Sequence, residues 1–493
     1  MKIGTLACSL LIAGLSGCAL HQGQVLEAAG MPDAVFDTGE RRWLAGDHHI
    51  HSQFSAKYVE STDPAQPPTP VFGSDGRYSI TDNALKAREH GLAWMVSTDH
   101  GGPDHSKVNH DHAWPALQQA RREVPEVVQF FGMEFDTPGG DHSSLIMPHT
   151  HDERSDLHTI ESRWSQRDAW PRNPARDVEP KMLEALEHMR QLEAPPVLIA
   201  NHPSRSATAV GVYGKYAPAE FRAWKDTAPQ VAVGMEGAPG HQAAAIDPDG
   251  RIDPEGARGG YKNAPTMGGF DQMTARLGGF WDSMLGEGRR WWVTSTSDAH
   301  RHWRDGGSDF YPGEYSKTYV LAKHGHDDIL DGIRNGRVFV TTGDLISELD
   351  VVVRSSAAPD THVGIGGNLH AHSGSDIEVA IRVRDPAGTN HGGHSPEVAR
   401  VDLIVGEVTG PASDRSSDAN PTTRVVRRFT ATDWVRDGEY LTMTRTLPAI
   451  ATSSYLRVRG TSTTDLEPAA DPRGEDPWTD LWFYSNPVFI DVH

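Results

Sequence analysis

"SDGRYSITDNALKAREHGLAWMVSTDH", residues 74–100, holds a helix pattern and a buried-strand pattern in one uninterrupted stretch. The segment 80–91 predicts an α-helix, because Thr81 or Asp82 can cap its start and Gly91 can end it. The apolar run that follows predicts a short buried strand. A helix that leads into such a strand is part of the repeating unit of an α/β fold.

The strand pattern recurs along the chain, each time with charged or histidine residues at its carboxyl end. The runs are "LAWMVSTDH" (92–100), "VVQFFGMEFD" (127–136), "PPVLIANHP" (195–203), "VAVGMEG" (231–237) and "RWWVTSTSDAH" (290–300). "DDILDGIRNGRVFVTTG" (327–343) adds a last helix and strand. Alternating strands and helices predict a parallel α/β sheet or barrel, in which polar groups at the carboxyl ends of the strands form the active site.

After about residue 348 the apolar residues follow a period of two, with Gly, Asp, Ser and Pro turns between the runs. These runs are "DIEVAIRVRD" (376–385), "RVDLIVGEV" (400–408), "TRVVRRFTA" (423–431), "SYLRVRGTS" (454–462) and "NPVFIDVH" (486–493). Such alternation predicts an antiparallel β-sandwich. Since 493 residues are too many for one ordinary core, we expect two domains, an α/β domain over 41–347 and a β-sandwich over 348–493.

The composition is that of a soluble globular protein, with 37% hydrophobic and 23% charged residues. The formal net charge of -21 argues against a nucleic-acid-binding surface, because phosphate contacts need clustered Lys and Arg. An anionic substrate would need positive charge fixed locally, and metal ions supply it. We therefore expect a small-molecule substrate and no nucleic-acid partner.

The first twenty residues, "MKIGTLACSLLIAGLSGCAL", have the basic start, apolar run and small residues of an export signal. "LSGC" (15–18) resembles a bacterial lipobox, which implies a signal peptide over 1–17, a lipid on Cys18 and a tether over 18–40. A plain secretory signal is the alternative. The lipobox implies an exported bacterial lipoprotein, periplasmic or anchored in the outer membrane, that contacts the membrane only through its lipid.

The chain has two cysteines, Cys8 and Cys18, and the first lies inside the expected signal peptide. Cysteine metal sites and cysteine nucleophiles are therefore excluded from the mature chain. Any bound metal has to be held by His, Asp and Glu.

The stretch "GDHHIHS" (46–52) places His49 and His51 two positions apart. On a strand these two side chains share a face and can share a metal ion, whereas His48 points away. Further polar residues end the other apolar runs or begin the loops after them: Asp75, Asp99, His100, Glu134, His142, His202, Asp298 and His300. Each has an ordinary structural explanation when taken alone. Their joint placement at strand ends predicts a site for zinc, manganese or iron.

"PDHSKVNHDHAW" (103–114) is also rich in histidine but follows no predicted strand. We interpret it as a loop, with His105, His110 and His112 solvated or facing substrate rather than binding metal.

The order His-x-His, "SDG", helix, "TDH", Glu, isolated histidines and "SDAH" resembles the PHP family, named for polymerase and histidinol phosphatase. The resemblance covers roughly residues 43–343, and 74–100 are especially similar to the family's second block. "NGRVFVTTG" (335–343) before a β-domain that ends in "WFYSNPVFI" (482–490) is similar to the branch of carbaryl-type ester hydrolases. In one respect the chain departs from the family, because a long insertion separates His-x-His from "SDG".

The resemblance implies a distorted (β/α)7 barrel with two or three divalent metal ions, Mn, Zn or Fe, at the carboxyl ends of the strands. Three ligand sets are implied: His49, His51, Glu134 and Asp298 for one ion; Glu134, His142 and His202 for a second; Asp75, His100 and His300 for a third. Asp141 and His149 lie near His142 in the sequence and remain alternatives to it.

Two metal ions would activate a bridging hydroxide, so that no side-chain nucleophile is required. We expect Asp298 to accept a proton as well as bind metal, and His241 or His302 to act as general acid. Arg205 and Arg301 are candidates for gripping phosphoryl oxygens, with surface salt bridges as the alternative.

The leading prediction is a metal-dependent phosphoesterase acting on small-molecule phosphodiesters or phosphomonoesters. A carboxylester, carbamate or amide hydrolase is the alternative enzyme. A non-catalytic metal- or ligand-binding lipoprotein is the remaining hypothesis.

Overall fold

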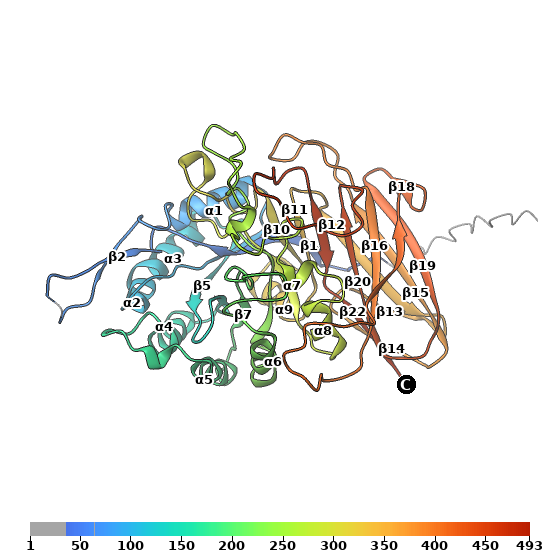
Figure 1. Cartoon of the computed structure of the whole chain (residues 1–493), viewed down its shortest axis with the longest axis horizontal. Helices are drawn as coiled ribbons and strands as arrows, with labels where there is room; N and C mark the ends of the chain where they lie inside the picture. The colour runs from blue at the N-terminus through green and yellow to red at the C-terminus, as the bar shows by residue number, and fades with distance from the viewer. Residues whose placement is uncertain (1–35, 64) are drawn as a thin grey trace, which may run out of the picture.

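The computed structural model describes residues 36–63 and 65–493, which form an α/β region followed by a β-rich region (Figure 1). The strands of the first region are β1 (Arg42–Ile50), β4 (Trp94–Ser97), β5 (Val128–Asp136), β6 (His142–Ile146), β7 (Val197–Ala200), β8 (Ala232–Ala238), β9 (Trp292–Ser295), β10 (Ser316–Ala322) and β11 (Val338–Thr342). Its longer helices are α1 (Ile80–Glu89), α3 (Trp114–Glu123), α4 (Glu153–Trp164), α5 (Glu179–Arg190), α6 (Pro218–Thr227), α8 (Phe280–Gly286) and α9 (His326–Arg334).

These strands form a mixed sheet in the order β11-β10-β1-β4-β5-β6-β7-β8-β9. The parallel pairs are β1 with β4, β4 with β5, β7 with β8 and β8 with β9. The expectation of a parallel sheet is wrong for β6 and β10, which are antiparallel to their neighbours. The reason for β6 is connection length, because the loop from β5 is too short for the crossover that a parallel strand requires.

β1 and β9 lie apart in this strand order but approach each other beyond their carboxyl ends. Ile50 forms an isolated parallel bridge with Ala299, and the backbone nitrogen of His51 donates to the carbonyl of Ala299 at 3.0 Å. The carboxyl end of β1 therefore lies beside the segment that follows β9, although nearly the whole α/β region separates them in sequence.

Helix α1 confirms the helix predicted over 80–91, but its cap differs. Ser79 is the N-cap, and it forms a capping box with Asp82. Thr81 and Asp82 were the expected caps; Asp82 instead supplies the acidic partner three residues after the cap. Gly91 follows the helix with a φ of 77°, as expected of a residue that ends it.

Close packing of α1, β1 and β4 builds the first part of the core. Trp94 is fully buried, and its ring lies against Gly46, where an added Cβ would come within 1.9 Å of the indole. The indole nitrogen donates to the carbonyl of Leu44 at 3.0 Å. These contacts hold β1 and β4 together, next to the loops that follow their carboxyl ends.

The β-rich region contains β12 (Glu348–Ser355), β13 (Ala358–Val363), β14 (Asn368–Ala371), β15 (Ser375–Arg384), β16 (Arg400–Glu407), β17 (Arg424–Phe429), β18 (Val435–Asp437), β19 (Tyr440–Ile450), β20 (Ser454–Thr461), β21 (Trp482–Ser485) and β22 (Val488–Val492). A separate antiparallel sheet has the order β13-β12-β15-β19-β18, as the alternating pattern predicted. Apolar residues of this sheet share one hydrophobic cluster with residues of β16, β20 and β22.

The second layer of the β-rich region departs from the expected antiparallel sandwich. β14 and β22 are parallel, and β21 pairs with β11, so this layer continues the large sheet of the α/β region. Asn486 adds a second connection: its amide oxygen accepts from the backbone nitrogen of Val293 at 2.9 Å, and its amide nitrogen donates to the Val293 carbonyl at 3.3 Å. The edge of β9 is therefore covered by the β-rich region.

Within the described residues, none of the helices combines the length and the apolar character that a bilayer crossing needs.

Candidate metal centre

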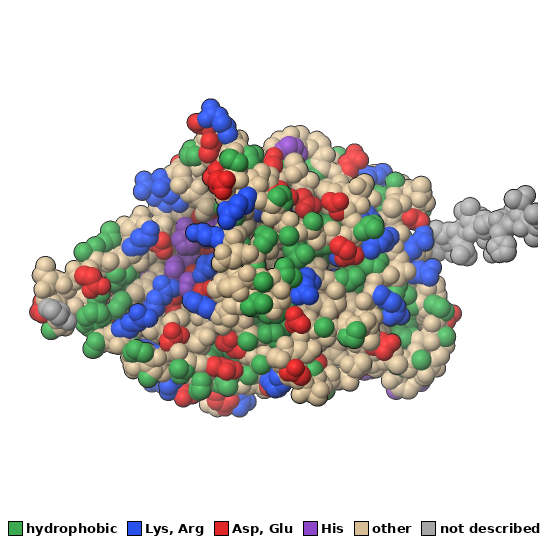
Figure 2. Space-filling model, in the orientation of Figure 1, with side chains coloured by type: hydrophobic (Ala, Val, Ile, Leu, Met, Phe, Trp, Pro, Cys, Tyr) green, Lys and Arg blue, Asp and Glu red, His purple; other side chains and the backbone are tan. Residues whose placement is uncertain are grey.

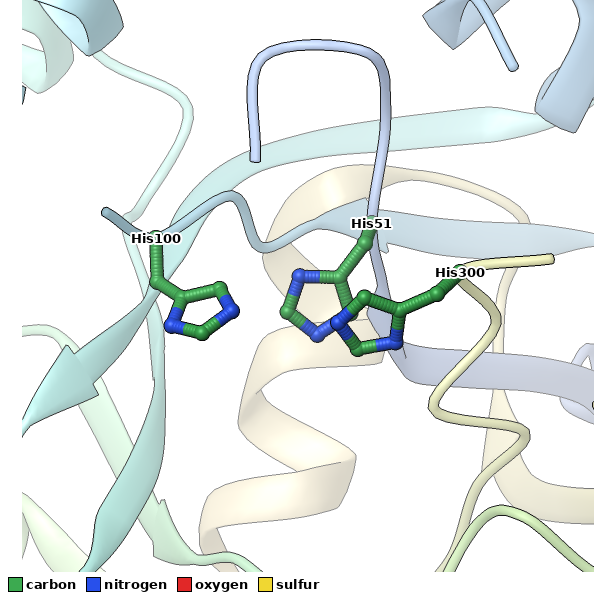
Figure 3. Close-up of side chains that lie close together, drawn as sticks. All are labelled: His51, His100 and His300. Carbon is green, nitrogen blue, oxygen red and sulfur yellow. The ribbon is translucent and has the colours of Figure 1, made fainter. Parts of the chain in front are cut away.

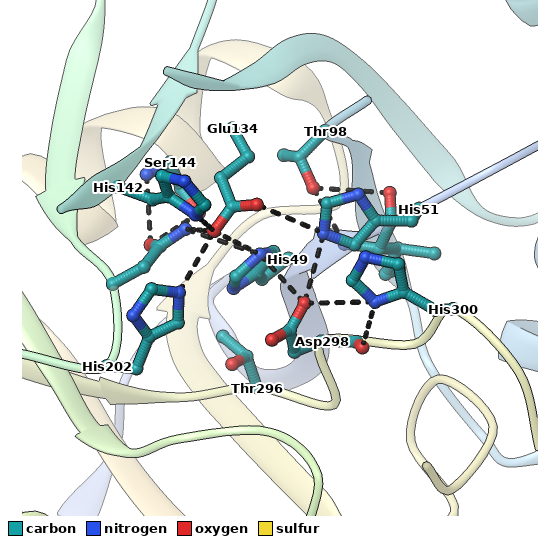
Figure 4. A network of polar contacts seen from close by, with 12 residues as sticks. His49, His51, Thr98, Glu134, His142, Ser144, His202, Thr296, Asp298 and His300 are labelled. Carbon is teal, nitrogen blue, oxygen red and sulfur yellow. Dashed lines mark hydrogen bonds and ion pairs between the residues drawn. The ribbon is translucent and has the colours of Figure 1, made fainter. Parts of the chain in front are cut away.

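Buried histidines and carboxylates from many parts of the chain meet at the carboxyl ends of the α/β strands (Figure 4). The structure brings together all nine predicted ligands: His49, His51, Asp75, His100, Glu134, His142, His202, Asp298 and His300. Each comes from a strand end or from the loop after one. His48 points elsewhere, as the strand period predicted, and its Nε2 lies 2.8 Å from Thr294 Oγ1.

The first group consists of His49, His51, Glu134 and Asp298, all of them buried. Nε2 of His49 lies 3.0 Å from Asp298 Oδ1 and 3.1 Å from Glu134 Oε1. Nε2 of His51 lies 3.0 Å from the same Asp298 oxygen and 3.5 Å from Glu134 Oε2. Two imidazole nitrogens and two carboxylates thus surround one position.

The second group is formed by Glu134, His142 and His202. His142 Nδ1 is 2.9 Å, and His202 Nε2 3.1 Å, from Glu134 Oε1. The two alternatives to His142 have other partners: Asp141 forms an ion pair with Arg205 at 2.8 Å, and His149 lies beside Glu153. Glu134 therefore lies between the first and second groups, where a bridging carboxylate would have to be.

The third group contains Asp75, His100 and His300, with His51 beside it. Asp75 Oδ2 lies 3.3 Å from His100 Nε2 and 3.9 Å from His300 Nε2. The rings of His51 and His300 are stacked with their centroids 3.7 Å apart, and His100 faces them from its own loop (Figure 3). Asp75 thus joins the site despite the insertion that separates it from the first two histidines.

The insertion is a hairpin that leaves the site and returns to it. Its strands are β2 (Lys57–Val59) and β3 (Thr69–Val71), and they project from the molecule in Figure 1. The backbone nitrogen of Gln53 donates to the Tyr78 carbonyl at 2.7 Å, which joins the two ends of the inserted segment. Gly76 is required there, because a Cβ would lie 2.0 Å from the carbonyl oxygen of Ser52.

The unpaired buried atoms of these side chains fit divalent metal ions. His51 Nε2 and Asp298 Oδ1 are 3.0 Å apart, yet neither has a hydrogen-bond partner among the residues that the structure describes. Both ring nitrogens of His100, Nδ1 of His142 and Nδ1 of His202 are also buried without one. Buried polar atoms are normally hydrogen-bonded, whereas ligands of one ion approach each other closely without being aligned to each other. The described residues thus form several groups able to hold metal.

Residues around the ligands fix their orientation. Glu236, fully buried, accepts from Nδ1 of His49 at 2.7 Å and from the backbone nitrogen of His202 at 2.6 Å. Ser55 Oγ lies 2.8 Å from Nδ1 of His51. With Nδ1 protonated in each ring, Nε2 is left free to bind metal. Glu236 was not among the predicted site residues, although its position near the end of the run 231–237 was a usable signal.

Buried aspartates hold the loops that carry the ligands. Asp99 accepts from the backbone nitrogen and the hydroxyl of Ser52, at 2.6 and 2.7 Å. Asp271 binds Ser204 in the same way at 2.8 and 2.7 Å. The same pairing links Asp47 with Ser297, at 3.0 and 2.5 Å. Each serine lies within two residues of a predicted ligand, so these bonds fix the backbone from which the ligand side chain extends.

Three site residues hold unusual backbone conformations. His202, His241 and Asp298 have φ angles of 31°, 54° and 48°. Positive φ is uncommon for residues other than glycine, and such strained positions cluster at functional sites. The surrounding hydrogen bonds maintain this strain, which aims the three side chains into the centre.

The mutual charges of the site keep its carboxylates ionised. Burial raises the pKa of Glu134, but the charges of His142 and His49 outweigh burial and hold this pKa well below its ordinary value. Asp298 follows the same rule, with His49 and His241 as the opposing charges. Ionised carboxylates are the form that binds divalent cations, and a bound cation would supply the positive charge in place of the histidine protons.

A cavity of about 290 Å³ opens over the centre, and its lining includes Arg205, His241 and Arg301. Histidine side chains are visible at its mouth, with Lys and Arg side chains around them (Figure 2). His241 Nε2 is 3.0 Å from Asp298 Oδ2, and its Nδ1 is 2.5 Å from Asp309 Oδ1. His302, the other candidate acid, lies outside this lining, with its Nε2 2.9 Å from Glu314.

One expectation about the histidine-rich stretch 103–114 is wrong. It forms α2 (His105–Val108) and a π-helical turn (Asn109–Ala113) rather than a loop. His105 is buried rather than solvated or facing substrate, because Nδ1 lies 2.7 Å from Glu161 and Nε2 lies 3.1 Å from the carbonyl of Phe54. The predicted lipidation site, Cys18, lies outside the described residues.

Comparison with known proteins gives little beyond this geometry. No protein-family model matches the chain, and no curated protein matches it. Among solved structures, a β-glucosidase from Listeria innocua in complex with glucose shares 10% identity over 69% of this chain, with a TM-score of 0.13. The aligned part spans 53% of the glucosidase chain, about half its length. A similarity this low carries no argument about fold or activity.

Proposed function

We propose that the protein is a metal-dependent phosphoesterase that hydrolyses phosphodiesters or phosphomonoesters of small molecules. The observation that carries this proposal is the position of Glu134, which has Nε2 of His49 and His202 each 3.1 Å from its Oε1. A carboxylate between two groups of nitrogen ligands supports a bridged pair of ions.

The ligand sets that we propose follow the three groups. His49, His51, Glu134 and Asp298 would hold one ion; Glu134, His142 and His202 a second; Asp75, His100 and His300 a third. Membership in the PHP family and closure of the strands β1 to β9 as a distorted (β/α)7 barrel belong to the same proposal. The Ile50–Ala299 bridge supports closure, because it joins the two ends of that run.

Divalent ions bound there would lower the pKa of a coordinated water and polarise the attacked ester. The chain's own contribution is proton transfer. Asp298 directs Oδ1 to His49 and Oδ2 to His241, 3.0 Å from each. His241, which Asp309 holds through the other ring nitrogen, carries a proton on Nε2 that it can give to the leaving oxygen. The proton that Asp298 takes up can then pass to His241 and restore it.

The two arginines of the cavity would orient the substrate. Arg205 and Arg301 belong to its lining, and a guanidinium group can bind two phosphoryl oxygens at once. They would thus hold the phosphoryl group against the metal centre. We further propose an exported, lipid-anchored protein, on the strength of the "LSGC" signal.

A comparison of two chromogenic substrates tests the proposal. Manganese-loaded protein should hydrolyse bis(p-nitrophenyl) phosphate with a higher kcat/KM than p-nitrophenyl acetate. Asp298→Asn should lower phosphoesterase kcat by at least roughly 100-fold, because it removes a ligand charge and the proton acceptor. Asp249→Asn is the matched control, since Asp249 is exposed and forms an ion pair with exposed Arg251. Faster hydrolysis of the acetate would instead favour the carboxylester hydrolase.

A further inference from the structure

Three cations gather on one side of the cavity, around His142 and Asp141. Arg205 Nη2 lies 2.8 Å, and Lys215 Nζ 3.8 Å, from the same oxygen of Asp141. Arg167 binds Asp136 through Nε at 2.6 Å, and its Nη2 lies 2.6 Å from His142 Nε2. We call Arg167, Arg205 and Lys215 the cationic cluster.

The cationic cluster carries more positive charge than its partners neutralise. Its three side chains share two carboxylates, Asp136 and Asp141, and both of these are buried. The chain as a whole has a formal net charge of -21, so the surplus is local. A local charge opposite to that of the whole chain points to recognition of an anion at this place.

The cationic cluster is also open to a solute. The exposed fractions of the Arg167, Arg205 and Lys215 side chains are 42%, 32% and 55%. Arg205 lines the cavity itself, and its backbone nitrogen donates to the carbonyl of His202 at 3.0 Å. The cluster therefore lies next to the ligands of the second group, within reach of a molecule bound at the metal centre.

The scissile phosphoryl group has other positive partners. Metal ions held by Glu134 and Asp298 would face it, and Arg301 lines the cavity near His300. Within residues 36–63 and 65–493, the Arg301 guanidinium has neither an ion pair nor a hydrogen-bond acceptor. Arg301 is thus available for the phosphoryl group. Arg205 can be shared between that group and a second anion, and the charges of Arg167 and Lys215 remain for the second anion.

We propose that the cationic cluster is a subsite for a second anionic group of the substrate, a carboxylate or a second phosphoryl group. This inference rests on the proposed function in one respect: the phosphoesterase activity determines which of the two anionic groups is cleaved. The substrate class is then a small phosphate ester with two anionic groups. A cavity of about 290 Å³ is at the low end of ligand sites, which supports a small molecule.

Binding of stable phosphonates tests the subsite without turnover. Calorimetry on manganese-loaded protein would compare methylphosphonate, which has one anionic group, with phosphonoacetate and methylenediphosphonate, which have two. We expect both of the latter to bind at least roughly tenfold more tightly at low salt, with a preference that shrinks as salt is added. Their ranking tells whether the subsite prefers a carboxylate or a phosphoryl group.

Variants of Lys215 assign the preference to the cationic cluster. Lys215→Met should reduce the preference for two anionic groups by roughly three- to tenfold, and Lys215→Arg should retain it. Lys323→Met is the matched control, because Lys323 is similarly exposed and pairs with Glu40 beyond the opposite end of β10. Equal binding of all three phosphonates, or an unchanged preference in both Lys215→Met and Arg205→Met, would overturn the proposal.

Hydrolysis rates of phosphoglycolate and of its carboxamide, which keeps the phosphoryl group but lacks the carboxylate, distinguish failure of the subsite from failure of the proposed function. Faster hydrolysis of phosphoglycolate, with the advantage reduced in Lys215→Met, supports both. Tighter binding of the doubly anionic phosphonates without hydrolysis of either ester supports the subsite and refutes the phosphoesterase. Equal hydrolysis together with equal binding supports the phosphoesterase and refutes the subsite.

Discussion

Glu236 accepts a hydrogen bond from His49 and does not line the cavity. Its replacement by glutamine therefore tests whether this bond orients the His49 ring for metal binding. Both of its oxygens accept hydrogen bonds: Oε1 from His49 Nδ1 and from Thr296 Oγ1, at 2.7 and 2.9 Å, and Oε2 from the backbone nitrogen of His202, at 2.6 Å. Burial raises the pKa of Glu236, but the charge of His49 outweighs it and the pKa is lowered. Glu236 is therefore an ionised acceptor at neutral pH.

Glu236→Gln keeps the volume but turns one acceptor into a donor. If the new NH₂ group faces His202, two N–H donors oppose each other. If it faces His49, the His49 ring has to carry its proton on Nε2, the nitrogen directed at Glu134 and Asp298. Either arrangement loses one charge-assisted hydrogen bond, about 1.5–3 kcal/mol. Because roughly 1.4 kcal/mol corresponds to a tenfold change, metal affinity should fall by about 10- to 100-fold.

Competition with a chelator measures this loss. Wild type and variant would be dialysed against graded chelator, and retained manganese would be determined by mass spectrometry. Glu220→Gln is the control, since Glu220 is also buried but lies in α6. A change below about threefold in Glu236→Gln, or an equal loss in Glu220→Gln, would refute the claim that Glu236 orients a metal ligand.

Three further predictions concern metal content, pH dependence and anchoring. Purified protein should contain two to three equivalents of Mn, Fe or Zn by mass spectrometry, and His49→Ala should lose metal while circular dichroism stays unchanged; a folded wild type without metal would contradict this. Burial and the charge of Glu179 raise the pKa of Glu220 from 4.5 to about 8. The native state therefore binds more protons than the unfolded state between these values, and the free energy of unfolding falls as pH rises through them. Glu220→Gln should be more stable than wild type near pH 8.5 and similar to it near pH 5 in urea denaturation; equal differences at both pH values would refute this. Cys18→Ser should release the protein from the membrane fraction in an immunoblot, and unchanged fractionation would rule out the lipid anchor.

The clustering of these histidines and carboxylates was predictable because their types and their spacing along strands are local properties. His49 and His51 share a face through the strand period, and the polar ends of apolar runs indicate the carboxyl edge of a sheet. The structure also places Asp75 beside His100 and His300, although the hairpin that returns it to the site could not be derived from the spacing. The structure places these side chains close together, and their proposed roles in binding metal stay predictions.

The remaining features depend on contacts between distant segments. β6 begins with polar residues and owes its antiparallel direction to the short loop before it. Burial of His105 depends on Glu161, which is 56 positions away. The cationic cluster combines residues from two loops, one after α4 and one between β7 and α6, so no single motif marks it. Contacts of this kind between distant segments leave no local sequence pattern from which they could be predicted.

The contact between Asn486 and Val293 has a consequence for the order in which the chain becomes native. Strand β9 leads directly to Asp298, yet its edge is closed by a residue 193 positions further along. During synthesis, β9 lacks this partner until Asn486 has emerged, and segments that fold as units need all of their parts. We therefore expect the metal centre to mature late, with metal loading only after Asn486 has been synthesised.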